Sequence, residues 1–262
     1  MTNETIYLIG GTTEARRAVA RLEQEGFRVV VSVATAMGEA QAAGYTTETG
    51  RKSAREMAEQ ASGYGACAFI DCSHPFAIEV SEETRRAAGF VNIPYFRYSR
   101  PASAEFGSGV TIVKSWEEAV DALAGSGRRS LLTIGTRNLA LFVAAGLDFT
   151  ARVLPVAESI DACTRLGIGP ENIIAAYPPH SIDFNRTCIR RARAAMLLAK
   201  DSGREGGLPD KLEAAAAEGA HVIIVSRPEE EGATDDLDVL VENLRQSLKQ
   251  NQTSKRREGS NQ

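Results

Sequence analysis

The chain has 262 residues, of which 43% are hydrophobic and 24% charged, with a formal net charge of −4. These values are typical of a globular protein of two modest domains, and the slight acidity gives no reason to expect a nucleic-acid partner. No apolar run is long enough for a bilayer and no leader pattern begins the chain, so we expect a cytoplasmic protein with no membrane partner.

Four cysteines, Cys67, Cys72, Cys163 and Cys188, lie far apart except for the first two, and they form no metal-ligand pattern with a histidine, which predicts reduced thiols and no metal site.

The first feature along the chain is an apolar run that ends in two glycines. Residues 6–9 predict a strand, Gly10 and Gly11 a turn, and the apolar spacing of residues 15–22 a helix. In a parallel sheet, such a turn directs the first N–H groups of the helix at a crevice where phosphates bind. Thr12, a natural N-cap, can also offer its hydroxyl to an anion. The alternative is a turn that only joins strand to helix, because Thr12 stands where the dinucleotide fingerprint has its second glycine.

Residues 28–34 predict a second, fully buried strand, which completes a βαβ unit. At its end, around Thr35, there is neither an acidic residue to hold ribose hydroxyls nor an arginine to hold a 2′-phosphate. The choice between NADH and NADPH therefore stays open.

The rest of the first half places polar residues at strand ends. Residues 51–65 predict a helix and 66–72 a strand, which runs into Ser73 and His74. His74 would then lie at the carboxyl end of a parallel strand, where ligands bind, although a lone histidine can equally be structural. A further strand at 92–98 brings in Arg97 and Arg100, each either a surface charge or part of an anion clamp.

The second half repeats this alternation. A strand at 130–134 is followed by the turn Gly135-Thr136 and a helix at 137–145, and a strand at 194–199 delivers a polar loop, residues 200–207. Lysine, hydroxyl and glycine together are residue types that hold phosphate. The alternative is a flexible surface loop.

Alternating strands and helices predict the α/β class, with two Rossmann-like lobes of parallel sheets that face each other across an inter-lobe cleft. We expect an N-terminal lobe at 1–124, which includes a short strand at 110–113, and a glycine-rich hinge at 125–129. The C-terminal α/β lobe would then span 130–248, and the polar residues 249–262 are expected to be a disordered tail.

Four short motifs occur in an order that is distinctive as a set. They are residues 10–16 (Gly-Gly-Thr-Thr-Glu-Ala-Arg), 73–77 (Ser-His-Pro-Phe-Ala), 132–135 (Leu-Thr-Ile-Gly), and 200–203 (Lys-Asp-Ser-Gly) with 211–214 (Lys-Leu-Glu-Ala). Over about residues 5–230, the chain closely resembles the precorrin-6A reductase family of corrin synthesis, which includes the cobalt-precorrin-6A reductases. The chain departs from the family pattern at 34–37 and 49–52, two positions where the resemblance implies contacts with cofactor phosphate or substrate.

The resemblance implies an enzyme that uses NADPH or NADH to saturate one double bond of an anionic, tetrapyrrole-derived macrocycle. The cofactor-binding residues expected at the strand-end turns are Gly10, Gly11, Thr12, Thr13, Glu14, Thr35, Ser73, Gly135, Thr136, Ser202 and Gly203. The expected partners of substrate carboxylates are Arg97, Arg100, Arg137 and Arg204. His74 and Lys200 are the candidate proton donors, with solvent as a third source.

Two other functions are compatible with the same fold. One is a different nicotinamide- or nucleotide-dependent enzyme, and the other is a non-catalytic ligand-binding protein. The oligomeric state does not follow from the sequence.

Overall fold

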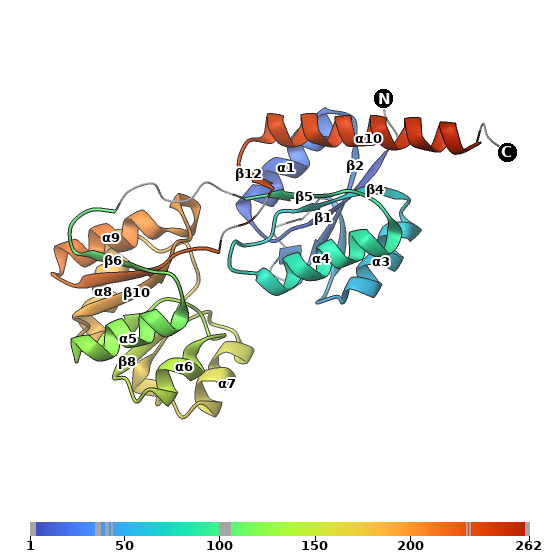
Figure 1. The fold of residues 1–262 in the computed structure, drawn as a ribbon. Helices are drawn as coiled ribbons and strands as arrows, with labels where there is room; N and C mark the ends of the chain where they lie inside the picture. Colours follow the sequence, from blue (N-terminus) through green and yellow to red (C-terminus); the bar gives the residue numbers. More distant parts are fainter. Residues whose placement is uncertain are drawn as a thin grey trace. The chain divides into compact units, whose positions relative to one another are not determined.

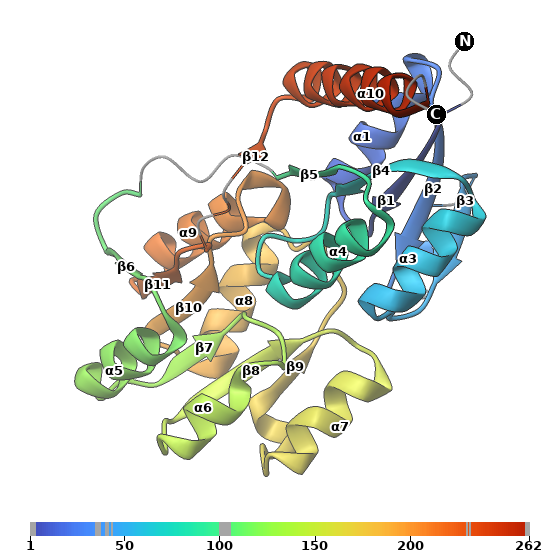
Figure 2. The same ribbon diagram turned by 45° about the vertical axis from the view of Figure 1, so that its right-hand side comes forward.

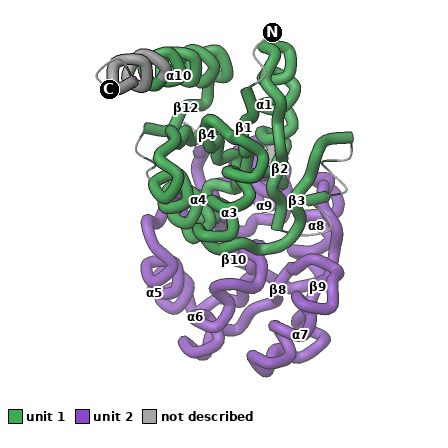
Figure 3. Tube along the Cα trace, turned by 90° about the vertical axis from the view of Figure 1, so that its right-hand side faces the viewer, with its two compact units in different colours: residues 1–101, 229–262 green, residues 102–228 purple. Residues whose placement is uncertain are grey.

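The computed structural model describes residues 4–34, 38, 39, 42, 44–99, 106–228, 230 and 232–259, apart from the side chains of 205 and 252–259. The chain divides into two compact units (Figure 3). Unit 1 comprises Met1–Pro101 and Glu229–Gln262, and unit 2 comprises Ala102–Pro228. The prediction of two α/β lobes with parallel sheets is confirmed.

Unit 1 is built on a six-stranded parallel sheet (Figure 1). In chain order its strands are β1 (Thr5–Ile9), β2 (Arg28–Val33), β3 (Thr46–Thr49), β4 (Ala66–Asp71), β5 (Tyr95–Tyr98) and β12 (Ala233–Thr234). In space the order is β3-β2-β1-β4-β5-β12, and each neighbouring pair is parallel. The strand order reverses between β1 and β4, so the crevice beyond their carboxyl ends is the place where such sheets bind ligands.

Helices cover both faces of this sheet. One face carries α1 (Thr13–Gln24) and α10 (Leu237–Gly259), and the other carries α3 (Ala54–Gly63) and α4 (Ile78–Val91). Successive side chains of a strand point to opposite faces of the sheet, so both faces of β1 are covered. Ile6 and Leu8 pack against α1 and α10, and Tyr7 and Ile9 pack on the opposite face with α3 and α4.

Unit 2 contains a second six-stranded parallel sheet, ordered β6-β11-β10-β7-β8-β9. Its strands are β6 (Val110–Val113), β7 (Ser130–Leu132), β8 (Phe149–Val153), β9 (Ile173–Ala175), β10 (Met196–Lys200) and β11 (His221–Val225). Its helices are α5 (Trp116–Ser126), α6 (Leu139–Ala144), α7 (Ala157–Arg165), α8 (Ile182–Ala192) and α9 (Leu208–Ala217), with short 3₁₀ turns η1 (Pro170–Asn172) and η2 (Arg204–Gly206). Helices α8 and α9 pack together on one face, and α5 and α6 lie on the other (Figures 1 and 2).

The domain boundaries differ from the expected ones. Strand β6, expected in the first lobe, pairs with β11 of unit 2, and α10, expected in the second lobe, packs in the core of unit 1. The chain therefore passes from unit 1 to unit 2 after β5 and returns after β11. The expected hinge at 125–129 instead lies inside unit 2, at the end of α5. The hydrophobic pattern locates strands, but it does not say which sheet a short edge strand joins.

Some predicted elements also change in extent. Helix α10 continues to Gly259 where a disordered tail was expected from residue 249, and α6 is shorter than the predicted helix at 137–145. Helix α8 and strands β3 and β12 were not predicted. No helix in the described part of the chain has the length and apolarity that crossing a bilayer requires.

A buried ionic network holds β12 and the chain before it to the sheet of unit 1. Arg97 on β5 is 2% exposed, and its Nη1 lies 3.2 Å from Asp71 Oδ1 and donates to the Ser73 carbonyl at 3.0 Å. On its other side, Nη2 lies 2.7 Å from Glu230 Oε1. The Ser99 N–H donates to the Thr234 carbonyl at 2.9 Å and continues the β5–β12 pairing.

Replacing this buried cation should strongly destabilise unit 1. Arg97→Ala leaves the Asp71 carboxylate, which is fully buried, without its cation, and such a loss costs about 3–5 kcal/mol. Urea unfolding of the full chain measures this change. The matched control is Arg86→Ala, which removes an exposed ion pair with Glu83 and should cost less than about 1 kcal/mol. Equal losses in the two variants would contradict a structural role for the network.

Candidate functional site

The turn after β1 requires both of its glycines. A β-carbon on Gly10 would lie 2.6 Å from Cγ1 of Val31, so only glycine lets the turn approach β2 this closely. Gly11 has a φ of +97°, a backbone conformation that glycine adopts without strain. The Gly10 N–H also donates to the Ser32 carbonyl at 2.8 Å. The turn is thus fixed against β2.

Thr12 caps helix α1 and uses its hydroxyl within the protein. Its Oγ1 accepts from the Ala15 N–H at 3.1 Å and donates to the Cys72 carbonyl at 2.7 Å. The expectation that this hydroxyl is available to an anion is therefore wrong, because its one proton is already donated. An anion at this turn would instead meet backbone N–H groups of the first helical turn.

Glu14 and Thr13, also predicted to bind the cofactor at this turn, differ in exposure and in hydrogen bonding. Glu14 is 4% exposed, and its charge helps to raise the pKa of Cys72 and of Tyr98, so the carboxylate lies near these two side chains. Thr13 Oγ1 accepts a hydrogen bond from Arg16 Nη2 at 3.3 Å. Thr35 and Arg100 lie outside the described residues.

The loop that carries His74 lies next to the glycine turn, at the point where the strand order reverses. The Cys72 N–H donates to the Ile9 carbonyl at 3.0 Å. The buried Ser73 places its N–H 2.9 Å from Asp71 Oδ1. His74 is half-buried and its Nδ1 accepts from the Phe76 N–H at 3.2 Å, so the neutral ring carries its proton on Nε2.

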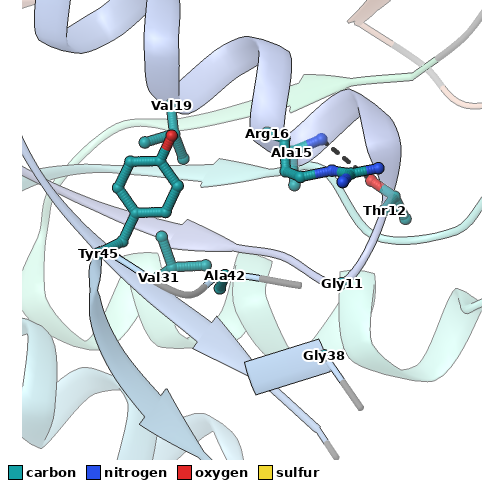
Figure 4. A pocket seen from close by; sticks show the side chains of 9 residues that line it. All are labelled: Gly11, Thr12, Ala15, Arg16, Val19, Val31, Gly38, Ala42 and Tyr45. Atoms are coloured by element: carbon teal, nitrogen blue, oxygen red, sulfur yellow. Dashed lines mark hydrogen bonds between the residues drawn. The ribbon is translucent and has the colours of Figure 1, made fainter. Parts of the chain in front are cut away.

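A small pocket, open to solvent, lies between α1 and the described residues that follow β2 (Figure 4). The lining residues are Gly11, Thr12, Ala15, Arg16, Val19, Val31, Gly38, Ala42 and Tyr45. In a nucleotide-binding βαβ unit, this side of the glycine turn faces the ribose of the bound nucleotide. The sequence analysis did not identify the pocket, because its walls come from segments that only the fold brings together.

The second predicted site lies at the corresponding reversal of the sheet in unit 2, between β7 and β10. Thr133 donates both its N–H and its hydroxyl to the Leu198 carbonyl, each at 2.9 Å. These bonds hold the Gly135-Thr136 turn beside the loop that begins at Lys200. The strand ends of unit 2 therefore bring the predicted residues of that half together.

The loop at 200–207 is packed and hydrogen bonded. Asp201 is 4% exposed and pairs with Arg227 at 3.3 Å, and the buried Ser202 donates its hydroxyl to the Gly206 carbonyl at 3.2 Å. These contacts oppose the alternative of a flexible surface loop. They also mean that Ser202 uses its hydroxyl proton within the loop.

Five basic side chains gather at this end of unit 2, and we call them the basic cluster: Arg137, Arg152, His180, Lys200 and Lys211. Arg152 and Lys211 are only 6% and 8% exposed. Lys200 lies over the Trp116 ring, with Nζ 5.6 Å from its centroid. Arg152 Nη1 donates to Asn185 Oδ1 at 2.6 Å and Lys211 Nζ to the Gly206 carbonyl at 3.3 Å, so both have neutral acceptors.

The pKa values of the basic cluster show that its charges repel one another. Burial, then Arg152 and Lys200, lower the pKa of Lys211 to about 7, while Asp210 opposes this as the weakest of the four causes. Burial and Arg137 lower the pKa of Lys200 to about 8. Burial, Arg152 and Lys211 lower the pKa of His180 to about 4. A bound anion would relieve this repulsion, so the cluster is suited to hold carboxylate or phosphate.

The predicted arginines fall into different environments. Arg137 and Arg204 are exposed, and Arg137 belongs to the basic cluster. Arg97 is enclosed by Asp71 and Glu230, so the structure does not support its predicted role as an anion clamp for substrate. A charged residue inside an apolar strand was the signal that should have suggested a buried partner for Arg97.

The sequence analysis assigned no role to Arg152, His180 or Lys211. Arg152 could have been noticed as a cation in a strand whose five residues are all buried. Lys211 stands in one of the four motifs, and none of the motifs contains His180. Their convergence depends on the packing of α9 and of the loop after β9, which no local pattern reveals.

Two sheets in the Rossmann strand order, each with polar residues at its reversal point, define a protein of two Rossmann-like α/β lobes. The family model of precorrin-6x reductase CbiJ/CobK matches residues 5–245, and the chain belongs to this family.

The chain is similar to proteins named cobalt-precorrin-6A reductase. That of Priestia megaterium is 32% identical over 87% of this chain and 92% of its own length. That of Salmonella typhimurium is 33% identical over 87% of this chain and 89% of its own length. Among solved structures, CobK precorrin-6A reductase matches with a TM-score of 0.72 and 24% identity over 93% of this chain and 97% of that one, which supports the fold.

Removing the most buried charge of the basic cluster should stabilise the protein. The pKa of Lys211 is about 7 in the folded state and near 10.5 in an unfolded chain, so its destabilising contribution is complete below pH 7 and disappears as the pH rises toward 10.5. Lys211→Met should therefore raise the free energy of unfolding by roughly 1 kcal/mol or more at pH 6, and by less at pH 9. Urea unfolding at the two pH values measures this.

Lys114→Met, at an exposed lysine, is the control and should change stability little at either pH. A loss of stability in Lys211→Met at pH 6 would mean that the cation is satisfied in the folded protein, contrary to the cluster's description.

Proposed function

We propose that this precorrin-6A reductase of cobalamin biosynthesis uses NADH or NADPH to reduce one double bond of the precorrin-6A macrocycle, or of its cobalt form. Family membership supports the substrate, and the relatives named above act on the cobalt form according to their names. The basic cluster is the structural observation that carries the proposal. An anionic macrocycle with many carboxylates needs cations at its binding site, and the basic cluster brings five basic side chains together.

We assign the carboxylates of the substrate to the basic cluster, with Arg204 as a further exposed contributor. Arg137 and Lys200 lie at the strand ends of unit 2, next to the Gly135-Thr136 turn. Partial desolvation strengthens each charge-assisted hydrogen bond relative to one in water. Binding a carboxylate should also raise the pKa of Lys200 and Lys211, so substrate binding is accompanied by proton uptake near neutral pH.

We assign the cofactor to the glycine turn and the adjoining pocket of unit 1. Gly10 and Gly11 keep this face free of side chains, and the first N–H groups of α1 are available to its phosphates. Ser73 lies at the same reversal point but is buried. The cofactor supplies the hydride, and the protein supplies binding, orientation and a proton. The expected cofactor contacts at Gly135, Thr136, Ser202 and Gly203, like the inter-lobe cleft, stay predictions.

The reduction adds a hydride and a proton across one double bond, and it oxidises NAD(P)H to NAD(P)⁺. We propose Lys200 as the proton donor, since a pKa of about 8 keeps its ammonium largely protonated at neutral pH yet acidic enough to give up a proton. His74 is the second candidate through its Nε2–H, and solvent is the third.

The direct test is a spectrophotometric assay of the purified chain with NADH or NADPH and precorrin-6A, with and without cobalt. We expect oxidation of the cofactor that depends on the macrocycle. Cofactor binding without turnover of the macrocycle would favour a different nicotinamide-dependent enzyme. Binding of the macrocycle without any redox change would favour a non-catalytic binding protein.

The proton donor can be identified from the pH dependence. If Lys200 donates, kcat/KM should fall above about pH 8, as the ammonium of the free enzyme is lost. Lys200→Met should lower kcat by about 10²-fold and remove the part of the decline that begins near pH 8, whereas the effect of the Lys211 charge, which is lost from about pH 7, should persist. His74→Gln should keep the decline. A Lys200→Met enzyme with unchanged kcat and pH profile would exclude Lys200, and an unaltered His74→Gln enzyme would assign His74 to packing.

A further inference from the structure

We propose that Arg227 is a positioning residue, which holds the start of the loop at 200–207 and thereby keeps the Lys200 ammonium at the strand ends of unit 2. The proposal rests on the proposed function, because that function gives Lys200 the role of proton donor. It deepens the function by naming a side chain that acts on the reaction through another one. Neither the four motifs nor the basic cluster includes Arg227.

Arg227 reaches the loop because two neighbouring strands end side by side. Strands β10 and β11 are parallel, with Lys200 opposite Val225, and the Asp201 N–H donates to the Val225 carbonyl at 2.9 Å. Arg227 stands two residues after β11, and Pro228 restricts its backbone to extended conformations. The sheet therefore brings Arg227 beside the first residues of the loop.

The guanidinium of Arg227 holds both the side chain and the main chain of Asp201. Its Nε lies 3.3 Å from Asp201 Oδ2, and its Nη2 donates to Oδ1 and to the Asp201 carbonyl, each at 3.3 Å. Contact of two nitrogens with two carboxylate oxygens is bidentate, which fixes orientation as well as distance. The two side chains are only 11% and 6% exposed. Because Asp201 directly follows Lys200, these contacts fix the backbone beside Lys200.

The end of the loop is held by different contacts. Ser202 Oγ and Lys211 Nζ both donate to the Gly206 carbonyl, at 3.2 and 3.3 Å. These two bonds do not involve Arg227 or Asp201. Loss of Arg227 should therefore loosen the start of the loop and leave its end in place.

The properties of Lys200 depend on where the loop holds it. Its Nζ lies over the Trp116 ring, 5.6 Å from the centroid. Burial and the charge of Arg137 lower its pKa to about 8, and its own charge acts on Lys211. Away from this position the ammonium would be hydrated, and its pKa would return toward about 10.4. Such an ammonium is a weaker acid at neutral pH.

The test follows the lysine side chains of the full chain by heteronuclear NMR between about pH 6 and pH 10, with Lys200→Met to assign the Lys200 signal. In wild type, Lys200 should titrate near pH 8, and the ring current of Trp116 should shift its side-chain protons. Arg227→Met should raise the midpoint by about one pH unit or more and reduce the ring-current shift. The matched control is Arg190→Met, which removes an exposed arginine paired with Glu218 and should change neither signal.

A double variant separates position from charge. Arg227→Met removes a cation that faces the Asp201 carboxylate, and the charge of that carboxylate could by itself raise the pKa of Lys200. Arg227→Met combined with Asp201→Asn removes both charges. If Arg227 acts by position, the ring-current shift should stay reduced in the double variant. Recovery of the wild-type shift and midpoint in the double variant would overturn the proposal. Melting temperatures close to wild type should show that the variants fold.

The macrocycle assay adds a readout of activity. Arg227→Met should lower kcat roughly tenfold through misplacement of the donor, while KM changes by less than about twofold. Unchanged NMR signals or an unchanged kcat in Arg227→Met would overturn the role of Arg227, even where wild type reduces the macrocycle. Altered NMR signals would support the positioning of Lys200 by Arg227, even if wild type reduced no macrocycle and so failed the proposed function.

Discussion

The architecture of unit 1 depends on a buried charge, the guanidinium of Arg97. It joins the end of β4, the strand β5 and the chain just before β12, which are far apart in sequence. Strand β12 has only two residues, so pairing with β5 alone would give it few hydrogen bonds. The ion pair with Glu230 adds a desolvated contact at the point where the chain returns to unit 1. Because Arg97 also bonds the Ser73 carbonyl, the same network fixes the loop that presents His74.

The return of the chain explains how unit 1 completes its Rossmann strand order although it is built from two separate segments, whereas unit 2 is continuous. The sheet of unit 1 takes its sixth strand from the end of the chain, and the sheet of unit 2 takes its own from β6, which precedes its other strands. Each sheet therefore keeps a reversal point flanked by strands on both sides. At both reversal points a glycine-containing turn lies beside a polar loop, and these loops carry most of the residues that sequence motifs had suggested.

Sequence patterns predicted most of the elements and the strand-end turns, because both depend on local chemistry, although α8, β3 and β12 were missed. Gly10 and Gly11 are required by a close approach and a positive φ, and apolar periodicity marks the helices. Three features could not be predicted in this way, because local sequence patterns do not reveal contacts between distant segments. They are the pairing of β6 with β11, the hydrogen bond from the Thr12 hydroxyl to the Cys72 carbonyl, and the burial of cations around Lys211. Each involves contacts between segments far apart in sequence.

The two candidate sites differ in how they would attract an anion, and the difference follows from their partners. In unit 1 the glycine turn offers backbone dipoles, which are already oriented by the helix and cost little to maintain. In unit 2 the basic cluster gathers charges whose mutual repulsion and burial destabilise the folded protein. A protein retains such a cluster when a ligand regularly compensates it. If a polyanion binds the basic cluster as proposed, it would raise the lowered pKa of Lys211 and Lys200, and a ligand of higher charge would gain more from neutralising the cluster.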